Sequence, residues 1–300
     1  MNKLAVGIPF FASKNIAPLL LCLKSLDRYS SLEYDLFILL NCSDPSQYQG
    51  FCFPEVLRIA NEVHVKYYSG DDNAYKQTLI DWIADSHFEY DYMFILHSDI
   101  FLYKNGVMER MLDALVGTDN LISYWDVPAQ LFQSTYHLSE SSKLTFMVAP
   151  RVSSWLMCIC VEKYRKFRDN CPLAKCLFLG FAKNTGDPQM QGVWEWFYKQ
   201  CSKKERRYLE QGNAIIDHGG VLRYYLSIGK ISGVVLGKDS NPNFDSMSLY
   251  YNPYGYVHIG QTDPNRYNDS FYSKKLLQVR MNEIKKLLNE NYNIELNDDF

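Results

Sequence analysis

The chain has 300 residues, of which 47% are hydrophobic, 22% charged and 15% aromatic. A chain of this length buries about 75% of its unfolded surface, so it can form a large core without disulfides or a structural metal. Its 16 glycines and 11 prolines, without a low-complexity run, exclude the collagenous and disordered classes. The formal charge is −3 and no long basic stripe occurs, so we expect no nucleic-acid partner.

The cysteines and the N-terminal residues bear on the cellular compartment. Among the eight cysteines no C-x-x-C pair occurs, which favours reduced thiols in a cytosol over a disulfide framework or a zinc finger. The first apolar run is interrupted by Pro9 and is too short for a signal peptide. No window approaches eighteen apolar residues, the length of a membrane span. We therefore predict a cytoplasmic protein.

The first 125 residues alternate between apolar runs typical of buried strands and amphipathic segments typical of helices. The runs predict strands at residues 4–10, 34–40, 63–68 and 92–96, and helices at residues 15–26, 74–84 and 107–115. This alternation predicts an α/β fold with an open, mostly parallel sheet flanked by helices. Ligands of such sheets bind outside the carboxyl ends of the strands, which selects the loops at residues 9–13, 41–44 and 97–101.

The second half of the chain is less regular. Apolar runs predict strands at residues 121–125 and 154–161, and helical periodicity is visible at residues 163–168 and 193–199. Residues 270–289 form a strongly amphipathic pattern that predicts a C-terminal helix. We expect this helix to pack either on the core or on a second subunit. In the second case the protein would be a homodimer.

An imidazole and a carboxylate directly follow the fourth predicted strand. His97 and Asp99 are two residues apart, and side chains at this spacing on an extended backbone point the same way. Both can therefore face one bound cation or one polar substrate group. In the other interpretation, Asp99 caps the next element and His97 packs within the strand. A short H-x-D motif is common by chance, so the motif alone leaves both interpretations open.

Several motifs together resemble the family 2-type glycosyltransferases of the GT-A fold. Residues 6–10, Val-Gly-Ile-Pro-Phe, resemble the first strand of that family with its Ile-Pro turn. Residues 41–44 lie where the family has an Asp-rich turn that recognises the nucleotide base, and residues 72–74 resemble its Asn-containing loop. The segment His97-Ser98-Asp99 resembles the Asp-x-Asp motif that holds a divalent metal against the donor diphosphate. The shared order covers roughly residues 3–125.

The resemblance implies a GT-A fold with an irregular acceptor-side region toward the C-terminus. It implies a metal-dependent transfer from a UDP-, GDP- or dTDP-linked sugar to a glycan or lipid-linked acceptor, in cell-surface glycan synthesis. The implied donor-binding residues are Pro9, Phe10, Asn41, Ser43, Asp44, Asn73 and Ser98. The chain then divides into a nucleotide-sugar half at residues 1–125, an acceptor-side and catalytic half at residues 126–269, and a C-terminal helix with an acidic tail at residues 270–300.

The chain departs from the family at the first carboxylate of Asp-x-Asp, which is His97 here. The resemblance then implies a metal held by Asp99 and His97 with a further histidine from near the C-terminus, a role for which His258 is the first candidate and His218 the second. The implied metal is Mn²⁺ or Mg²⁺, and a mixed Asp/His set suits Mn²⁺, which accepts imidazole more readily. A lone histidine is also a common structural residue.

An inverting transfer needs a carboxylate that takes the proton of the acceptor hydroxyl. The family places a catalytic acid at the start of a helix comparable to the one predicted near residue 193. Asp187 is the first candidate for this base and Glu195 the second. Asp187 also suits a helix N-cap with Pro188 at the first helical position, and capping is compatible with catalysis. A retaining enzyme would not need this base.

Two other functions stay open from the sequence. The missing first aspartate, at His97, supports a catalytically degenerate GT-A domain that binds glycan or scaffolds a partner. A sugar-phosphate nucleotidyltransferase needs a Gly-rich loop after the first strand, and residues 9–13 read Pro-Phe-Phe-Ala-Ser instead. Basic clusters at residues 163–168 and 203–207 suit contact with a lipid-phosphate carrier at the inner face of the membrane, but solvated helix faces explain them more simply.

Overall fold

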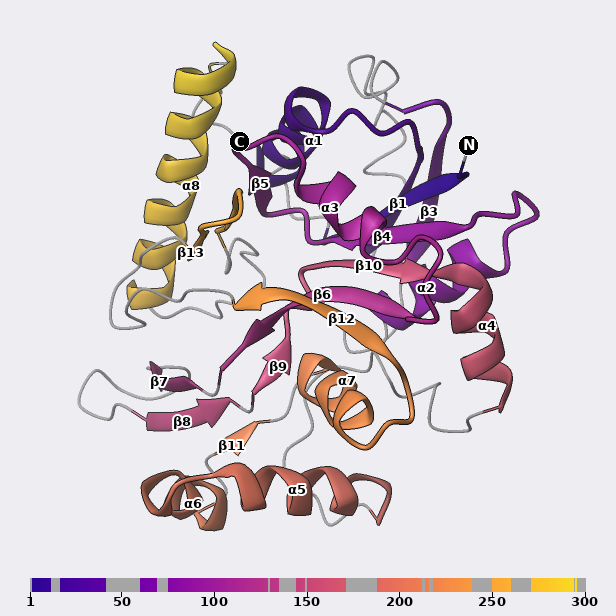
Figure 1. The fold of residues 1–300 in the computed structure, drawn as a ribbon. Helices are drawn as coiled ribbons and strands as arrows, with labels where there is room; N and C mark the ends of the chain where they lie inside the picture. Colours follow the sequence, from indigo (N-terminus) through magenta and orange to yellow (C-terminus); the bar gives the residue numbers. More distant parts are fainter. Residues whose placement is uncertain are drawn as a thin grey trace.

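A computed structural model shows a central sheet with helices on both faces and two smaller sheets beside it (Figure 1). The structure describes residues 2–11, 17–41, 60–68, 75–128, 130–134, 144–148, 150–170, 188–211, 214–215, 218–238, 250–259, 271–293 and 295. No helix in these ranges is both long and apolar enough to cross a membrane. The four described cysteines, Cys22, Cys158, Cys160 and Cys201, are buried and form no disulfide.

The central sheet has eight strands: β1 (Leu4–Phe11), β2 (Asp35–Asn41), β3 (Val63–Tyr68), β4 (Tyr92–Leu96), β6 (Ile122–Val127), β9 (Arg151–Val152), β10 (Leu156–Cys160) and β12 (Gly233–Lys238). Their order is β12-β6-β10-β4-β1-β2-β3, with β9 paired to β6. The pairs β1–β2, β2–β3, β1–β4 and β6–β12 are parallel, whereas β10 is antiparallel to both β4 and β6. The predicted α/β fold with a mostly parallel sheet is confirmed.

Successive side chains along each strand point to opposite faces of the sheet, so one hydrophobic core forms on each face. On β2, Leu36 and Ile38 point to the face covered by α1 (Ala17–Tyr29) and α3 (Val107–Asp113), while Phe37 points to the opposite face. That opposite face is covered by α2 (Tyr75–Ala84), α4 (Val161–Asn170), α5 (Pro188–Gln200) and α7 (His218–Ser227). In Figure 1, α1 lies in the upper part of the view, near β1, and α7 lies below β12. Because β1, β2 and β4 are buried on both faces, their sequences read as the continuous apolar runs that predicted them.

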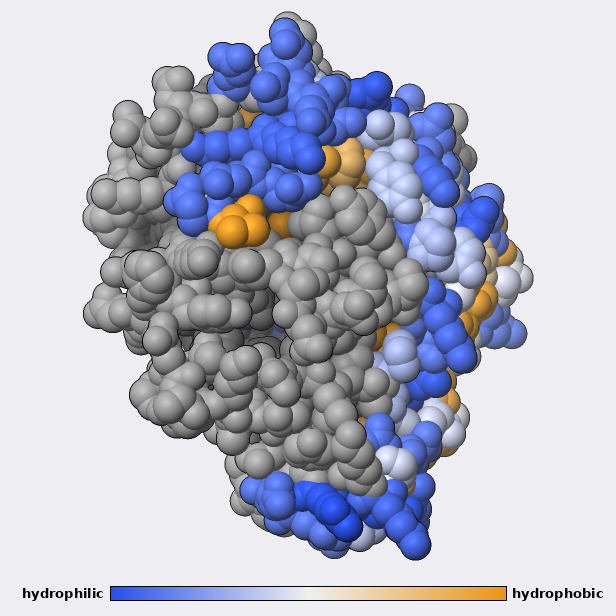
Figure 2. Space-filling view, turned by 90° about the vertical axis from the view of Figure 1, so that its left-hand side faces the viewer, coloured by the Kyte–Doolittle hydropathy of each residue, from blue (hydrophilic) through white to orange (hydrophobic). Residues whose placement is uncertain are grey.

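A second sheet of three short antiparallel strands lies against the C-terminal helix. Its strands are β5 (Ile100–Leu102), β13 (Tyr250–Asn252) and β14 (Tyr256–His258), and the helix is α8 (Phe271–Tyr292). Leu21 of α1, Phe101 of β5 and Ile284 of α8 share one buried cluster. The amphipathic helix predicted at the C-terminus is therefore present and packs on the core. Figure 2 views the molecule from the side that carries α8, and the described residues on this side are mainly hydrophilic.

The remaining elements were not predicted from the sequence. A third sheet consists of β7 (Gln130–Ser134), β8 (Leu144–Val148) and β11 (Ala214–Ile215), and α6 (Lys203–Glu210) follows α5. Helix α6 begins with a capping box, in which the Ser202 hydroxyl accepts from the Glu205 amide and the Glu205 carboxylate accepts from the Ser202 amide. The strand expected at residues 154–161 ends at Cys160, because α4 begins at the next residue.

Candidate metal centre

The turn after β4 brings His97 and Asp99 together. The His97 amide donates to the carbonyl of Trp155 at 2.9 Å, and the Ile100 amide donates back to the carbonyl of His97 at 3.2 Å. The second bond closes a turn, so these residues do not have the extended backbone that we expected. The two side chains nevertheless face each other, with Nδ1 of His97 3.8 Å from Oδ1 of Asp99.

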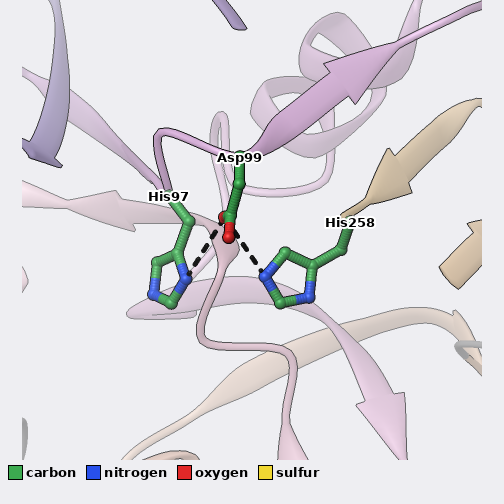
Figure 3. A group of neighbouring side chains, drawn as sticks. All are labelled: His97, Asp99 and His258. Carbon is green, nitrogen blue, oxygen red and sulfur yellow. Dashed lines mark ion pairs between the residues drawn. The ribbon is translucent and has the colours of Figure 1, made fainter. Parts of the chain in front are cut away.

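His258 reaches the same place from the other end of the chain. Strand β14 pairs with β5 so that His258 lies opposite Ile100, and the Ile259 amide donates to the Asp99 carbonyl at 3.0 Å. This register puts Nε2 of His258 3.3 Å from Oδ1 of Asp99 (Figure 3). Val257 and Ile259 point the opposite way, into the cluster under α8. The alternation of β14 therefore aims His258 at Asp99 while its neighbours anchor the strand.

The three side chains form a set of metal-ligand type. One ligand atom from each of His97, Asp99 and His258 lies within 4.8 Å of the other two. Their side chains are 23%, 11% and 12% exposed, so the group is largely shielded from solvent. Two imidazoles and one carboxylate are a donor set that Mn²⁺ and other first-row divalent cations accept. The residues present thus fit the divalent metal that the resemblance implies.

A buried thiol lies beside the group without belonging to it. Sγ of Cys22, on α1, donates to the carbonyl of His97 at 3.7 Å. Burial raises the pKa of this thiol, and the negative charge of Asp99 raises it further. Cys22 is therefore a neutral thiol at physiological pH, and the thiolate form that binds metals is not favoured there.

The position of the group agrees with the rule for open α/β sheets. It lies at the carboxyl end of β4, where ligands bind in this class of fold. Phe10 pairs with Leu40 and Phe11 with Asn41, so β1 and β2 end side by side. The three loops selected from the sequence thus belong to strands that are neighbours in the sheet.

The other predicted site residues have different outcomes. Pro9 and Phe10 are buried in β1, Asn41 is the last residue of β2, and Ser98 is half-buried between His97 and Asp99. Ser43, Asp44, Asn73 and Asp187 lie outside the described residues. Glu195 is exposed on α5 and accepts a hydrogen bond from Gln191 Nε2 at 2.9 Å. His218, the second histidine candidate, is the first residue of α7. The described residues thus bring together His97, Asp99 and His258 from the predicted set.

Trp155 is a site residue whose contact with the ligand-type group no sequence motif indicated, although its aromatic ring was one candidate platform for a sugar or a nucleobase. Its indole stacks on the imidazole of His258 with ring centroids 4.8 Å apart and planes at 10°. It follows β9 in the turn to β10, and its side chain is buried. No local motif marks it, because the contact joins segments about one hundred residues apart in the chain.

A second group of metal-ligand type lies at the opposite end of the sheet. Asp35, Glu62 and His64 sit where β2 and β3 begin, and their ligand atoms also lie within 4.8 Å of one another. The buried Asp35 accepts a hydrogen bond from the Tyr90 hydroxyl at 2.5 Å, and Glu62 is 58% exposed and pairs with His64 at 3.5 Å. A cavity of about 680 Å³ lies beside it, between His64 and Trp82. We therefore interpret these three residues as polar contacts within the protein. They lie at the amino ends of the strands, away from the carboxyl ends where ligands are expected.

The basic cluster at residues 163–168 has partners within the chain. Arg168 forms ion pairs with Asp81 at 3.1 Å and with Asp85 at 2.7 Å, both on or next to α2. Arg165 donates to the carbonyl of Ala84 at 2.6 Å, and Lys166 pairs with Glu162. Arg165 and Arg168 thus pack on α2, whereas Lys166, 70% exposed, lies on the solvated helix face that was one of the two expectations.

No protein-family model matches the sequence, and no curated protein matches it. Among solved structures, mouse xyloside xylosyltransferase 1 in its apo form is similar with 13% identity and a TM-score of 0.40, over 78% of this chain and 85% of that one. Residues 1–349 of Staphylococcus aureus TarS match with 13% identity and a TM-score of 0.37, over 59% and 53% of the two chains. The apo glycosyltransferase GlyE of Streptococcus pneumoniae matches with 11% identity and a TM-score of 0.42, over 77% and 45%.

Proposed function

We propose that this chain is a metal-dependent glycosyltransferase that moves a sugar from a nucleoside-diphosphate sugar to a hydroxyl acceptor. The observation that carries the proposal is the meeting of His97, Asp99 and His258 at the carboxyl end of β4. In an open α/β sheet this is the end where ligands bind. The reaction class comes from the sequence resemblance of residues 3–125 to family 2-type enzymes, whose Asp-x-Asp motif occupies the position of His97-Ser98-Asp99.

The three ligand-type residues would hold Mn²⁺ or Mg²⁺, and the two imidazoles favour Mn²⁺. A divalent cation bound there supplies Lewis-acid stabilisation of the negative charge that grows on the leaving nucleoside diphosphate. The chain contributes pre-organisation. The Ile259 amide and the Ile100 amide hold the backbone on both sides of the group, so the side chains are placed before a substrate arrives.

The donor would lie across the ends of β1, β2 and β4. We assign donor contacts to Pro9, Phe10, Asn41, Ser43, Asp44, Asn73 and Ser98, in agreement with the family motifs. Support comes from the sheet order, in which β1 lies between β2 and β4 and is parallel to both, so the three strands have their carboxyl ends on the same side of the sheet. Ser98, between two of the ligand-type residues, is the donor contact nearest in sequence to the metal group.

We assign the acceptor side to residues 126–269. If the reaction inverts the anomeric centre, Asp187 is the first candidate for the base that takes the acceptor proton, and Glu195 is the second. Support for these roles comes from the helix α5, which begins at Pro188 directly after Asp187 and carries Glu195 on an exposed face. The acceptor would be a glycan or lipid-linked molecule of cell-surface glycan synthesis, met in the cytoplasm or at the inner face of the membrane.

The proposal is tested by incubating the chain with UDP-, GDP- and dTDP-linked sugars with and without Mn²⁺ and measuring the released nucleoside diphosphate. We expect Mn²⁺-dependent release from at least one donor. The Asp99→Asn variant keeps the shape of the side chain but removes its charge, so it should abolish release and leave the thermal midpoint nearly unchanged. The matched control is Asp91→Asn, at an exposed carboxylate that accepts from the Lys3 amide at 2.7 Å.

Other outcomes identify the alternatives. No release from any donor, together with no donor binding in calorimetry, would instead favour a glycan-binding or scaffold role. Pyrophosphate formed from a nucleoside triphosphate and a sugar 1-phosphate would favour a nucleotidyltransferase. An Asp99→Asn variant that unfolds, or that retains full release, would show that Asp99 is structural or unimportant.

A further inference from the structure

The turn between β9 and β10, residues 153–155, contacts both segments that supply ligands to the candidate metal centre. The Trp155 carbonyl accepts from the His97 amide at 2.9 Å, and the Trp155 indole stacks on His258. The hydroxyls of Ser153 and Tyr256 are 3.3 Å apart, which adds a hydrogen bond to β14 two residues before His258. One short turn thus connects the His97 segment to the His258 segment.

The same turn is tied to the helix α2 by a buried cation. Lys76 is 1% exposed, and its Nζ donates to the Ser154 carbonyl at 2.9 Å and to the Ser154 hydroxyl at 3.2 Å. Charge-assisted hydrogen bonds in a buried setting are among the stronger ones in proteins. The guanidinium of Arg151 lies 5.3 Å from the centroid of the Trp155 ring. The contacts with Lys76 and Arg151 therefore fix the turn that carries Trp155 independently of its stacking on His258.

We propose that Trp155 is a positioning residue that sets the orientation of the His258 imidazole in the metal centre on which the proposed function rests. The Trp155 indole covers one face of the imidazole, with ring planes at 10° and centroids 4.8 Å apart. The nitrogens lie on the ring edge, and in this orientation Nε2 is 3.3 Å from Oδ1 of Asp99. Turning the imidazole out of this plane about its Cβ–Cγ bond gives up the face contact, so the indole holds the ring in the plane in which Nε2 faces Asp99. A half-turn keeps the stack but takes Nε2 away from Asp99, so Asp99 itself selects between the two orientations.

The competing explanation is that Trp155 only fills the core. Its side chain belongs to the buried cluster on the α1 face of the sheet, and its loss would then lower stability alone. A positioning role predicts something different, namely weaker metal binding by molecules that are still folded. Residues that orient metal ligands typically change metal affinity by about 10- to 100-fold when they are mutated.

The test is an Mn²⁺ titration followed by electron paramagnetic resonance on the full chain, with folding checked by circular dichroism. We expect Trp155→Leu to weaken Mn²⁺ binding by about tenfold, and Trp155→Phe to retain most of the affinity because a flat ring remains. Trp82→Leu is the matched control, since that indole packs on Phe37 with centroids 4.9 Å apart, at the other end of the sheet. In a His258→Gln background, Trp155→Leu should add no further loss of affinity.

Folded Trp155→Leu protein with wild-type Mn²⁺ affinity would overturn the inference and leave the proposed function intact. A wild-type chain that binds no Mn²⁺ would overturn both. Should Trp155→Leu fail to fold, the Mn²⁺ titration of Trp155→Met decides, because methionine fills much of the space of the indole and offers no flat ring. Weaker Mn²⁺ binding by folded Trp155→Met than by Trp155→Phe would support the inference. Wild-type affinity in folded Trp155→Met would overturn it.

Discussion

Asp99 and His258 are joined through main chain and side chain at once: Oδ1 of Asp99 lies 3.3 Å from Nε2 of His258, and the carbonyl of Asp99 accepts from the amide that follows His258. The backbone bond extends the β5–β14 pairing by one residue and does not depend on either side chain. Substitution of one side chain therefore leaves the other in place, and variants at these positions report on chemistry more than on folding.

His258→Gln should weaken Mn²⁺ binding by at least about tenfold, because the variant removes one of the three ligand-type side chains. The change in the thermal midpoint should be small, since the β5–β14 hydrogen bonds are retained. The measurement is an Mn²⁺ titration by electron paramagnetic resonance. His64→Gln, in the second group, is the matched control and should leave this affinity unchanged. The assignment fails if His64→Gln, and not His258→Gln, weakens the binding.

Tyr90→Phe should lower the free energy of unfolding by about 1.5–3 kcal/mol, because the Tyr90 hydroxyl donates to the buried carboxylate of Asp35. Tyr34→Phe is the contrasting variant. The Tyr34 hydroxyl is buried without a hydrogen-bond partner among the described residues, so its removal should be neutral or stabilising. Urea unfolding of the two variants checks the difference, and equal losses of stability would contradict the hydrogen-bond assignment.

Gly7→Ala should destabilise the fold by about 1–3 kcal/mol through overpacking. A Cβ at this position would lie 2.8 Å from Cδ1 of Ile83, 3.1 Å from Cδ1 of Ile95 and 3.2 Å from Cδ2 of Leu79. This crowding outweighs the gain of about 0.5–1 kcal/mol that alanine usually brings over glycine in a strand.

Ile83→Val removes the nearest crowding atom and provides the test of this mechanism. The double variant Gly7→Ala/Ile83→Val should lose less stability than the sum of the two single variants, because the new methyl group occupies the space of the deleted one. Urea unfolding measures the three free energies. Additive losses would show that crowding against α2 is not the cause.

Stability should decrease in alkaline solution as the pH rises from about 9 to about 11. Burial, and secondly the charge of Glu205, raises the pKa of Cys201 from 9.0 to about 11. A pKa that is higher in the folded state means that the unfolded chain loses this proton first, so stability is complete below the unfolded pKa and is lost toward the folded one. Buried Tyr164, whose pKa is raised by burial and by Asp81, adds to the loss at higher pH.

Urea unfolding at both ends of this pH range measures the effect. The Cys201→Ala variant removes one titrating group and should show a smaller decrease between the two pH values than the wild-type chain. An identical decrease in the two proteins would exclude Cys201 as a contributor.

Local pattern was enough to predict the elements that are buried on two sides or amphipathic. Strands β1 to β4 and helices α1 to α3 were predicted within a few residues of their ends, because burial on both faces or on one stripe leaves a signature in each segment itself. Strands β5, β12 and β14 were missed. They are short or half-exposed, and they are extended because they pair with strands that come from distant parts of the chain.

The amino-acid sequence by itself determined which residues face each side of the sheet and that a histidine and a carboxylate follow the fourth strand. Only the tertiary structure decided that His258 meets Asp99 and that Trp155 stacks on His258. The reason is physical: side-chain alternation is a property of neighbouring residues, whereas these meetings depend on a register between strands and on a turn supplied by a third segment. Such contacts are set by the packing of the whole chain and leave no periodic trace in any one segment.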